Sequence, residues 1–453
     1  MAVAHQVVPH RTPRGGELTP AQHAVVRRHL ALIPAYVFLI FGWSHVYLNL
    51  QPTNAAPADR DFMHFYVQGV VANSHDVHAL YDMDAQEAIL ASVVPGVHDV
   101  RFPPVYGPQV SLLFGPLARL PYATALQLWI GISLVLYALS MWALWRVSPQ
   151  LRDRPWTMVV LVAGAPALVF DVGFGQTAAL AVAFLTLGYL ALRANRPFLA
   201  GLAIGLLAYK PQLGLAAAFV FLFAGEWRIV LGALTMAALQ LVAGCAYWGL
   251  PILRAYLSAL GRIPTVAGDM ETFTFNMHSW RAFFELLLPS DVALQVYIVA
   301  AIFTAIVAFA CWRARGPLAL RYGAFLIATV LVNPHLYVYD LLLVVPALLL
   351  LWNWILEEPD QPIGVRYPAL ASSAIAGWSF RRCVEGLLYV CYFAPLFGAM
   401  ASDIHVQTSV VVHAALLAVI AARLVVRSEA ATDRAGTRPL ARAHHDPSVP
   451  QPI

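Results

Sequence analysis

Residues 122–146 read YATALQLWIGISLVLYALSMWALWR, and no charged side chain interrupts this stretch before Arg146. A helix needs about 20 mostly apolar residues to cross the hydrocarbon core of a membrane. Apolar runs of comparable length occur along the rest of the chain, at roughly 30–50, 155–172, 176–192, 229–250, 291–312, 317–332, 335–356, 383–401 and 408–427. The sequence therefore predicts an all-α, polytopic integral membrane protein.

The composition of the 453-residue chain supports this prediction, since 60% of its residues are hydrophobic and 11% are charged. Soluble globular domains have roughly 45–50% apolar and about 25% charged residues. The difference excludes a soluble enzyme, a disordered protein and a nucleic-acid-binding protein. The four cysteines lie in or beside apolar runs without CxxC spacing, so we interpret them as buried apolar side chains and not as disulfides or metal ligands.

Arginine placement predicts the topology, because cytoplasmic loops of membrane proteins carry an excess of Lys and Arg. The apolar segment 198–225 is interrupted by Tyr209-Lys210-Pro211-Gln212, so it forms either one kinked helix or a hairpin of two short helices. Only the hairpin places all arginine clusters on one side of the membrane. It gives about twelve crossings, within an expected range of about 10–12 transmembrane helices, with both termini in the cytoplasm. The clusters lie at 11–28, 146–154, 193–196, 228, 313–321 and 423–427.

This topology predicts one membrane domain over 29–427, with two long extracytoplasmic loops at 51–121 and 251–290. The first loop is acidic and is too long for a plain turn, so we expect short interfacial helices in it. The two tails, 1–28 and 428–453, are rich in Pro, Arg, Ala and His, which predicts disordered cytoplasmic segments.

Lys210 is the only lysine in the chain and lies where the apolar segment is broken, directly before Pro211. Ionisable groups at membrane depth are costly and usually mark a site or a pathway. We therefore interpret Lys210 as a cationic contact for a phosphate at the lipid boundary. The alternative is a lysine that snorkels from a helix end.

Asp61 follows the first apolar run and is a candidate general base for a hydroxyl nucleophile. Together with Asp59 it forms a DxD pair, a pattern that can hold a divalent cation beside a nucleotide diphosphate. No nucleotide is expected outside the cytoplasm, so we predict no metal site. The alternative interpretation is a solvated acidic loop.

Three further polar elements lie on the same predicted face. Asn333-Pro334-His335 and Tyr339-Asp340 begin an apolar run, and Asp340 needs a buried partner such as His335 or Tyr337. They line a reaction cavity or, alternatively, form a helix cap and a satisfied carboxylate. The other two elements are Gly175-Gln176 and, in the second long loop, Asn276 and His278. A lone Gln or His there is normally structural, and the histidines show no zinc-binding spacing.

The order and spacing of these elements resemble glycosyltransferase family 87, over about 58–350. Two segments carry the most specific part of the resemblance, Lys210-Pro211-Gln212-Leu213-Gly214 and Asn333-Pro334-His335 with Tyr339-Asp340. The remaining matches are Asp61-Phe62 with Tyr66, Leu80-Tyr81-Asp82, Phe102-Pro103-Pro104, Gly115-Pro116-Leu117, Leu120-Pro121, Gly175-Gln176, Arg196-Pro197 and Ala200-Gly201. Phe102 replaces the family's tyrosine, and Asn333 replaces a serine that is typical of its characterised mannosyltransferases.

The resemblance implies a GT-C-type fold and an inverting transfer of a hexose, with mannose expected. The donor would be a polyprenyl-phosphate sugar, and the acceptor a glycolipid or polysaccharide on the extracytoplasmic face of a bacterial plasma membrane. Asp61 would be the base, Lys210 would contact the phosphate, and His335 would line the cavity. Gln176 and Tyr66 would position sugar hydroxyls. No cofactor, metal or nucleic acid is expected. The predicted substrate-binding residues are Tyr66, Gln176, Lys210, Asn276, His278, His335, Tyr339 and Asp340.

Three other interpretations remain open at this stage. A broken helix with a charge is also typical of transporters and lipid flippases. Against this alternative, the polar residues gather on one face, and no inverted repeat is apparent. A related enzyme that transfers another sugar, such as arabinose or glucose, and a non-catalytic partner subunit are the other two.

Overall fold

The computed structural model describes residues 20–49, 61–270, 274–398 and 400–436, and within them every regular element is helical. The N-terminal half contains α1 (Pro20–Asn49), α2 (Phe62–Ser74), α3 (Met83–Val93), α4 (Pro108–Phe114), α5 (Tyr122–Arg146), α6 (Pro149–Arg152), α7 (Pro155–Ala163), α8 (Pro166–Phe174), α9 (Ala178–Arg193), α10 (Pro197–Gly205) and α11 (Leu215–Phe223). The C-terminal half contains α12 (Trp227–Trp248), α13 (Ile252–Met270), α14 (Trp280–Leu287), α15 (Ser290–Arg313), α16 (Leu318–Val332), α17 (Val344–Glu357), α18 (Ile363–Arg366), α19 (Phe380–Phe393), α20 (Ala401–Ile404) and α21 (Thr408–Gly436).

Short 3₁₀-helices connect several of these elements. They are η1 (Ala79–Tyr81), η2 (Leu117–Arg119), η3 (Leu206–Tyr209), η4 (Pro211–Gly214), η5 (Thr274–Asn276), η6 (Val338–Leu343), η7 (Pro368–Leu370) and η8 (Ala394–Phe397). Proline occupies the first turn of α7, α8 and α10, where its missing N–H costs no hydrogen bond and its fixed φ suits a helix. The sequence thus marks many helix starts directly.

Among the described residues, five helical segments are long and apolar enough to cross a membrane. They are Tyr122–Arg146, Pro155–Phe174, Trp227–Trp248, Ser290–Arg313 and Val338–Glu357. Six shorter apolar helical segments accompany them: Leu32–Leu48, Ala178–Arg193, Pro197–Tyr209, Pro211–Phe223, Leu318–Val332 and Thr408–Leu424. The protein is therefore an all-α, multi-pass membrane protein, as the sequence predicts.

The apolar helices differ in how deeply they are enclosed. In the segment Val338–Glu357, 94% of the apolar window is buried, compared with 17% in Trp227–Trp248. A helix that is apolar on all sides belongs at the centre of a bundle or in lipid. The chain after His335 therefore runs through the middle of the protein, and α12 lies at its edge.

The segment 198–225 reverses direction at Lys210. A Cβ built on Gly201 in α10 would lie 2.1 Å from the carbonyl oxygen of Ile229, near the start of α12. A single helix over 198–225 would separate its ends by about 40 Å at 1.5 Å per residue. This contact requires the chain to reverse direction between α10 and α12, as the hairpin interpretation predicts.

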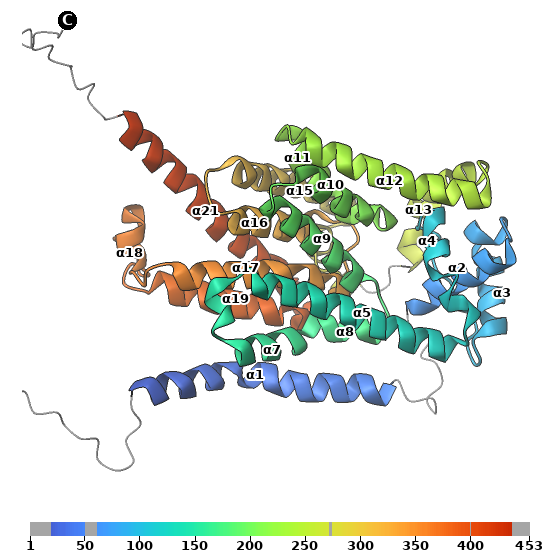
Figure 1. Ribbon diagram of the computed structural model, residues 1–453, viewed down its shortest axis with the longest axis horizontal. Helices are drawn as coiled ribbons and strands as arrows, with labels where there is room; N and C mark the ends of the chain where they lie inside the picture. The colour runs from blue at the N-terminus through green and yellow to red at the C-terminus, as the bar shows by residue number, and fades with distance from the viewer. Residues whose placement is uncertain (1–19, 50–60, 271–273, 399, 437–453) are drawn as a thin grey trace, which may run out of the picture.

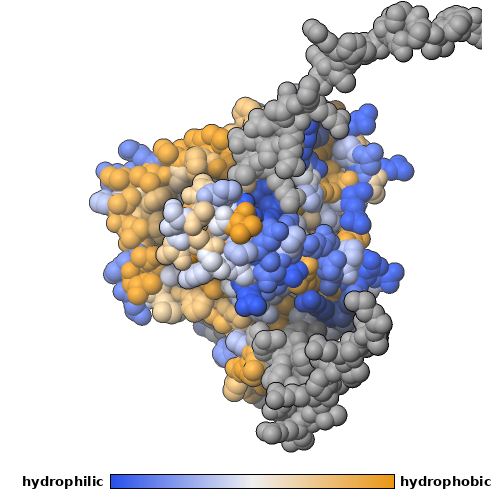
Figure 2. Space-filling view, turned by 90° about the vertical axis from the view of Figure 1, so that its left-hand side faces the viewer, coloured by the Kyte–Doolittle hydropathy of each residue, from blue (hydrophilic) through white to orange (hydrophobic). Residues whose placement is uncertain are grey.

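The helices of the two predicted outer loops lie together at one end of the molecule, where α2, α3, α4 and α13 are adjacent (Figure 1). The start of α1, the end of α21 and α18 lie at the other end. Viewed from that second end, hydrophilic residues occupy much of the face and hydrophobic residues line its flank (Figure 2). This arrangement is the one that a bundle crossing a membrane along its long axis would have.

The first long loop contains the short helices α2, α3 and α4, and α2 is buried along most of its length by apolar side chains such as Phe62, Met63 and Phe65. One local expectation needs correction. The parts of the tails at 20–28 and 428–436 continue α1 and α21 as helix, since adding a residue to an existing helix costs less than starting one. The remaining tail residues and Asp59 lie outside the described residues.

Candidate active site

Asp61 directly precedes α2 and is half-buried. The next residue, Phe62, is fully buried and stacks on Trp129 with 6.5 Å between ring centres. This anchor holds the backbone of Asp61 against the bundle. The Nε2 atom of Gln176 donates a hydrogen bond to Asp61 Oδ2 at 2.8 Å.

The turn that carries Gln176 is held from several sides. Gly175 ends α8 with φ +67°, and a Cβ on it would lie 2.7 Å from the Cβ of Phe62. Trp129 Nε1 donates to the carbonyls of Gly175 and Gln176, both at 3.1 Å. Gln176 Oε1 accepts from the backbone N–H of Thr177 at 3.2 Å, so its amide nitrogen faces Asp61.

Lys210 and Asp340 form a buried ion pair. Lys210 Nζ lies 2.6 Å from Asp340 Oδ1, and the two side chains are 3% and 0% exposed. The sequence predicts His335 or Tyr337 as the partner of Asp340, whereas the structure shows Lys210. The physical reason is that a buried carboxylate is compensated best by an opposite charge with hydrogen bonds.

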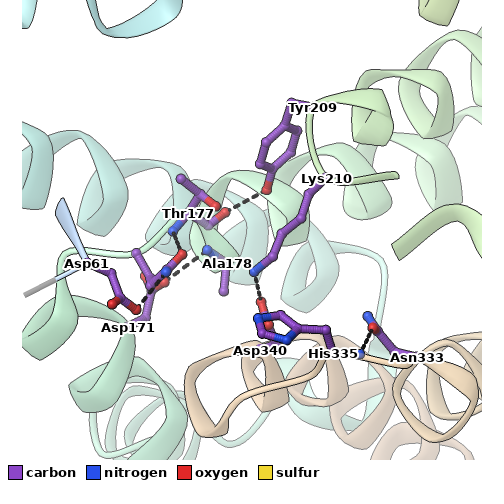
Figure 3. Close-up of polar contacts among 10 residues, drawn as sticks. Asp61, Asp171, Thr177, Ala178, Tyr209, Lys210, Asn333, His335 and Asp340 are labelled. Carbon is purple, nitrogen blue, oxygen red and sulfur yellow. Dashed lines mark hydrogen bonds and ion pairs between the residues drawn. The ribbon is translucent and has the colours of Figure 1, made fainter. Parts of the chain in front are cut away.

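Both members of the pair lie at breaks in helical structure, Lys210 between η3 and η4 and Asp340 within η6. Irregular backbone at membrane depth is tolerated where it is enclosed in protein or lines a cavity. Figure 3 shows Asp61, Lys210 and Asp340 converging from separate segments of the chain. The break between η3 and η4 thus places the Lys210 side chain next to the Asp340 carboxylate.

Tyr339 connects the two parts of this cluster. Its ring centre lies 5.2 Å from Lys210 Nζ. Burial raises the pKa of Asp61 above its usual range, while hydrogen bonds from Gln176 and Tyr339 and the charge of Lys210 act in the opposite direction. A carboxyl with a raised pKa is a stronger base once it is ionised. Asp61, Gln176, Lys210, Tyr339 and Asp340 therefore form one cluster.

The segment before Asp340 is also ordered by local contacts. Asn333 Oδ1 accepts from the backbone N–H of His335 at 2.8 Å, and the His335 ring packs on Tyr337 at 4.9 Å. His335 therefore lies on the ordered segment that carries Asp340, five positions before it.

Three predicted site residues make no direct hydrogen bond to this cluster among the described residues. The Tyr66 hydroxyl donates to the carbonyl of Leu120 at 2.9 Å. His278 is fully buried, and its Nδ1 lies 2.7 Å from Ser409 Oγ in α21. Its backbone N–H donates to Leu336 at 2.8 Å, so this loop touches the site segment through its backbone. Asn276 is half-buried at the end of η5.

Sequence reasoning missed several residues that shape the cluster. Trp129 holds the Gln176 turn, but in the sequence it is one more apolar residue of a membrane helix. Asp171 Oδ1 accepts from the backbone N–H of Ala178 at 2.9 Å, and the Tyr209 hydroxyl donates to the carbonyl of Thr177 at 2.9 Å. Of these residues, only Asp171 was marked as unusual by the sequence, because it is a carboxylate inside an apolar run. Among the described residues, no group of three or more His, Cys, Asp and Glu side chains is arranged to hold a metal ion.

Comparison with known families decides the assignment. The model of glycosyltransferase family 87 matches residues 105–346. This chain belongs to glycosyltransferase family 87. The family 87 match includes Gln176, Lys210, His335 and Asp340 but begins after Asp61, so it is shorter than the expected 58–350. The family membership makes the protein a membrane glycosyltransferase.

A curated relative extends beyond the family 87 match. It is a polyprenol-phosphate-mannose-dependent alpha-(1-2)-phosphatidylinositol pentamannoside mannosyltransferase from Mycolicibacterium smegmatis, 26% identical over 377 residues. The alignment covers 80% of this chain and 82% of the relative. No solved structure matches the chain. Together, the family and the relative support a hexosyltransferase.

Proposed function

We propose that this family 87 protein transfers a hexose, with mannose as first choice, from a polyprenyl-phosphate donor to a glycolipid or polysaccharide acceptor. The reaction takes place at the extracytoplasmic face of a bacterial plasma membrane, with Asp61 as the general base. The observation that carries the proposal is the Asp61–Gln176 hydrogen bond beside the buried Lys210–Asp340 pair. A base and a cation in one enclosed cluster suit transfer from a phosphate leaving group.

The proposed reaction is a single displacement. The Asp61 carboxylate takes the proton of the acceptor hydroxyl, whose oxygen attacks the anomeric carbon of the donor. The bond between this carbon and the phosphate oxygen breaks as the new glycosidic bond forms, so the configuration inverts. Polyprenyl phosphate leaves with the electron pair, and Asp61 then releases its proton to solvent. A phosphate leaving group needs little acid catalysis.

In this proposal Lys210 contacts the donor phosphate. An ammonium group has three N–H donors, and Asp340 accepts one of them at 2.6 Å. Two donors remain for phosphate oxygens. Asp340 then has the role of holding the Lys210 side chain in place, and the donor is proposed to bind between His335 and Tyr339. These two residues, with Gln176, are the proposed sugar and phosphate contacts.

The donor and acceptor classes are supported by the relative, whose printed name specifies polyprenol-phosphate-mannose and a phosphatidylinositol mannoside. Both are amphiphiles that present a sugar at a membrane surface. The multi-pass fold supports the same classes, because a lipid-linked donor reaches such a site without leaving the bilayer. One membrane domain over 29–427 with cytoplasmic termini is the topology that goes with this proposal.

The test uses purified full-length protein in lipid nanodiscs with synthetic polyprenyl-phosphate-mannose and a panel of mannosylated glycolipids. Release of polyprenyl phosphate and the stereochemistry of the product are measured. Asp61→Asn is expected to lower kcat by roughly 100-fold to 10,000-fold, as loss of a general base does. Asp84→Asn is the matched control, since Asp84 is an exposed acidic residue of the same loop.

A different experimental result would contradict each part of the proposal. Transfer that survives Asp61→Asn would remove Asp61 as the base. Turnover with a glucose or arabinose donor but not with the mannose donor would overturn the choice of sugar. Movement of the lipid donor across proteoliposomes, without any glycosidic product, would favour the transporter alternative.

A further inference from the structure

Tyr106 lies in the first long loop, two residues before α4 begins at Pro108. It is not among the residues that carry the resemblance to family 87. It is 7% exposed. Burial, together with the charges of Asp340 and Asp61, raises the pKa of its hydroxyl well above the usual range. The hydroxyl therefore stays protonated at neutral pH, and its ring packs on the first turn of α2, which Asp61 directly precedes.

The hydroxyl of Tyr106 differs from those of the neighbouring tyrosines. Tyr209 donates to the carbonyl of Thr177 at 2.9 Å, and Tyr81 donates to the carbonyl of Tyr106 at 3.2 Å. The Tyr106 hydroxyl makes no hydrogen bond to any residue that the structure describes. It is also absent from the set of fully buried polar atoms without a partner, so it is not completely enclosed. The exposed part of this side chain therefore includes the hydroxyl.

The ring of Tyr106 is held in place by the residues around it. His64 and Phe65 pack against it, each with 5.1 Å between ring centres. The backbone carbonyl of Tyr106 accepts a hydrogen bond from the Tyr81 hydroxyl at 3.2 Å. A fixed ring with an unpaired terminal hydroxyl is a preorganised hydrogen-bonding group, which costs little entropy when a ligand binds.

The surroundings of the hydroxyl select its partner. The Tyr106 ring packs on the first turn of α2, directly after Asp61, whereas the proposed phosphate contact, Lys210, lies between η3 and η4. A sugar hydroxyl is neutral and both donates and accepts hydrogen bonds. Since Asp61 is the proposed base for the acceptor, the sugar that reaches Tyr106 is the one carried by the acceptor.

We propose that Tyr106 determines acceptor specificity by hydrogen bonding, through its hydroxyl, to a sugar hydroxyl next to the one that Asp61 deprotonates. This inference rests on the proposed glycosyl transfer with Asp61 as base. It adds the first loop to the acceptor site and assigns it a residue that acts on acceptor binding.

The first experiment compares Tyr106→Phe with the wild type in the nanodisc assay. Loss of one neutral hydrogen bond is expected to raise the acceptor KM about threefold to tenfold, with the donor KM and kcat changed less than about twofold. Tyr137→Phe is the control, because the Tyr137 hydroxyl donates to the carbonyl of Val162 inside the bundle. A loss of folding alone would affect both variants and both substrates.

The second experiment identifies the acceptor hydroxyl with a series of monodeoxy acceptors. For the wild type, one deoxy acceptor is expected to show the same rise in KM as Tyr106→Phe shows with the full acceptor. On that acceptor the variant and the wild type become equal. An unchanged acceptor KM in Tyr106→Phe, or a change confined to the donor KM, overturns the inference. Absence of any transfer by the wild type overturns the proposed function itself, so the two failures are distinguishable.

Discussion

Lys210 and Asp340 are separated by 130 positions in the chain, yet their charged atoms lie 2.6 Å apart and both side chains are almost completely buried. A buried pair of this kind is expensive to break, because removal of one partner leaves an uncompensated charge. The pair joins the hairpin of α10 and α11 to the segment that enters the centre of the bundle. It therefore links the fold to the site.

The first prediction concerns this pair. Lys210→Met and Asp340→Asn are each expected to lower the free energy of unfolding by about 3–5 kcal/mol. The double variant Lys210→Met/Asp340→Asn should lose much less than the sum, since no charge is left unpaired. Denaturant titration in detergent measures the three values. The exposed Arg101–Asp84 pair is the control, and Asp84→Asn should cost below about 1 kcal/mol. Additive losses at Lys210 and Asp340 would contradict the coupling.

The second prediction concerns the pH dependence of transfer. Burial raises the pKa of Asp61, and the hydrogen bond from Gln176 lowers it. Gln176→Leu removes the lowering contribution, so the pKa of Asp61 rises further. Because the ionised carboxylate is the proposed base, the acid limb of the kcat/KM profile should move to higher pH. Activity lost at neutral pH should return as the pH is raised.

The control for this pH experiment is Gln86→Leu. Gln86 is a buried glutamine of the first loop whose amide donates to the carbonyls of Ala79 and Leu80. Its removal should change stability and leave the acid limb in place. An acid limb in Gln176→Leu that coincides with that of the wild type would separate Gln176 from the titration of the base.

The third prediction compares two glycines that share a left-handed backbone. Gly175 has φ +67° and Gly225 has φ +72°, so alanine at either position costs about 1–2 kcal/mol. A Cβ at 175 would also lie 2.7 Å from the Cβ of Phe62, the neighbour of Asp61, whereas a Cβ at 225 meets nothing within 4 Å. Gly175→Ala should lower kcat on the order of 100-fold through misplacement of Asp61 and Gln176. Gly225→Ala should lower stability only, and equal kcat values for the two variants would refute the positioning role.

The fourth prediction tests the chain reversal at Lys210. Gly201→Ala introduces a Cβ 2.1 Å from the carbonyl of Ile229, so α10 and α12 must separate. The expected loss of stability is about 1–3 kcal/mol. Gly131→Ala in α5 is the control, since a Cβ there meets nothing within 4 Å and alanine is a better helix former. Thermal unfolding in detergent distinguishes them, and a Gly201→Ala protein as stable as Gly131→Ala would contradict the close packing.

The candidate site was predicted in part. Asp61, Gln176, Lys210 and Asp340 stand out in the sequence because polar groups are rare in apolar surroundings. The partner of Asp340 was predicted wrongly, because sequence proximity favours His335 and Tyr337 while the structure supplies an opposite charge from a distant segment. Tyr66 and His278 carry polar atoms that the fold satisfies away from the cluster, and a sequence does not show which polar atoms are satisfied locally.

The amino-acid sequence by itself determined that the chain is a helical membrane protein, since the apolar runs match the thickness of a bilayer and the prolines mark helix starts. It also determined which few polar residues are unusual enough to form a site. Only the tertiary structure decided which of them are in contact: Lys210 with Asp340, and Gln176 with Asp61. Such meetings depend on contacts between segments more than a hundred residues apart, and the local pattern of a sequence does not contain them.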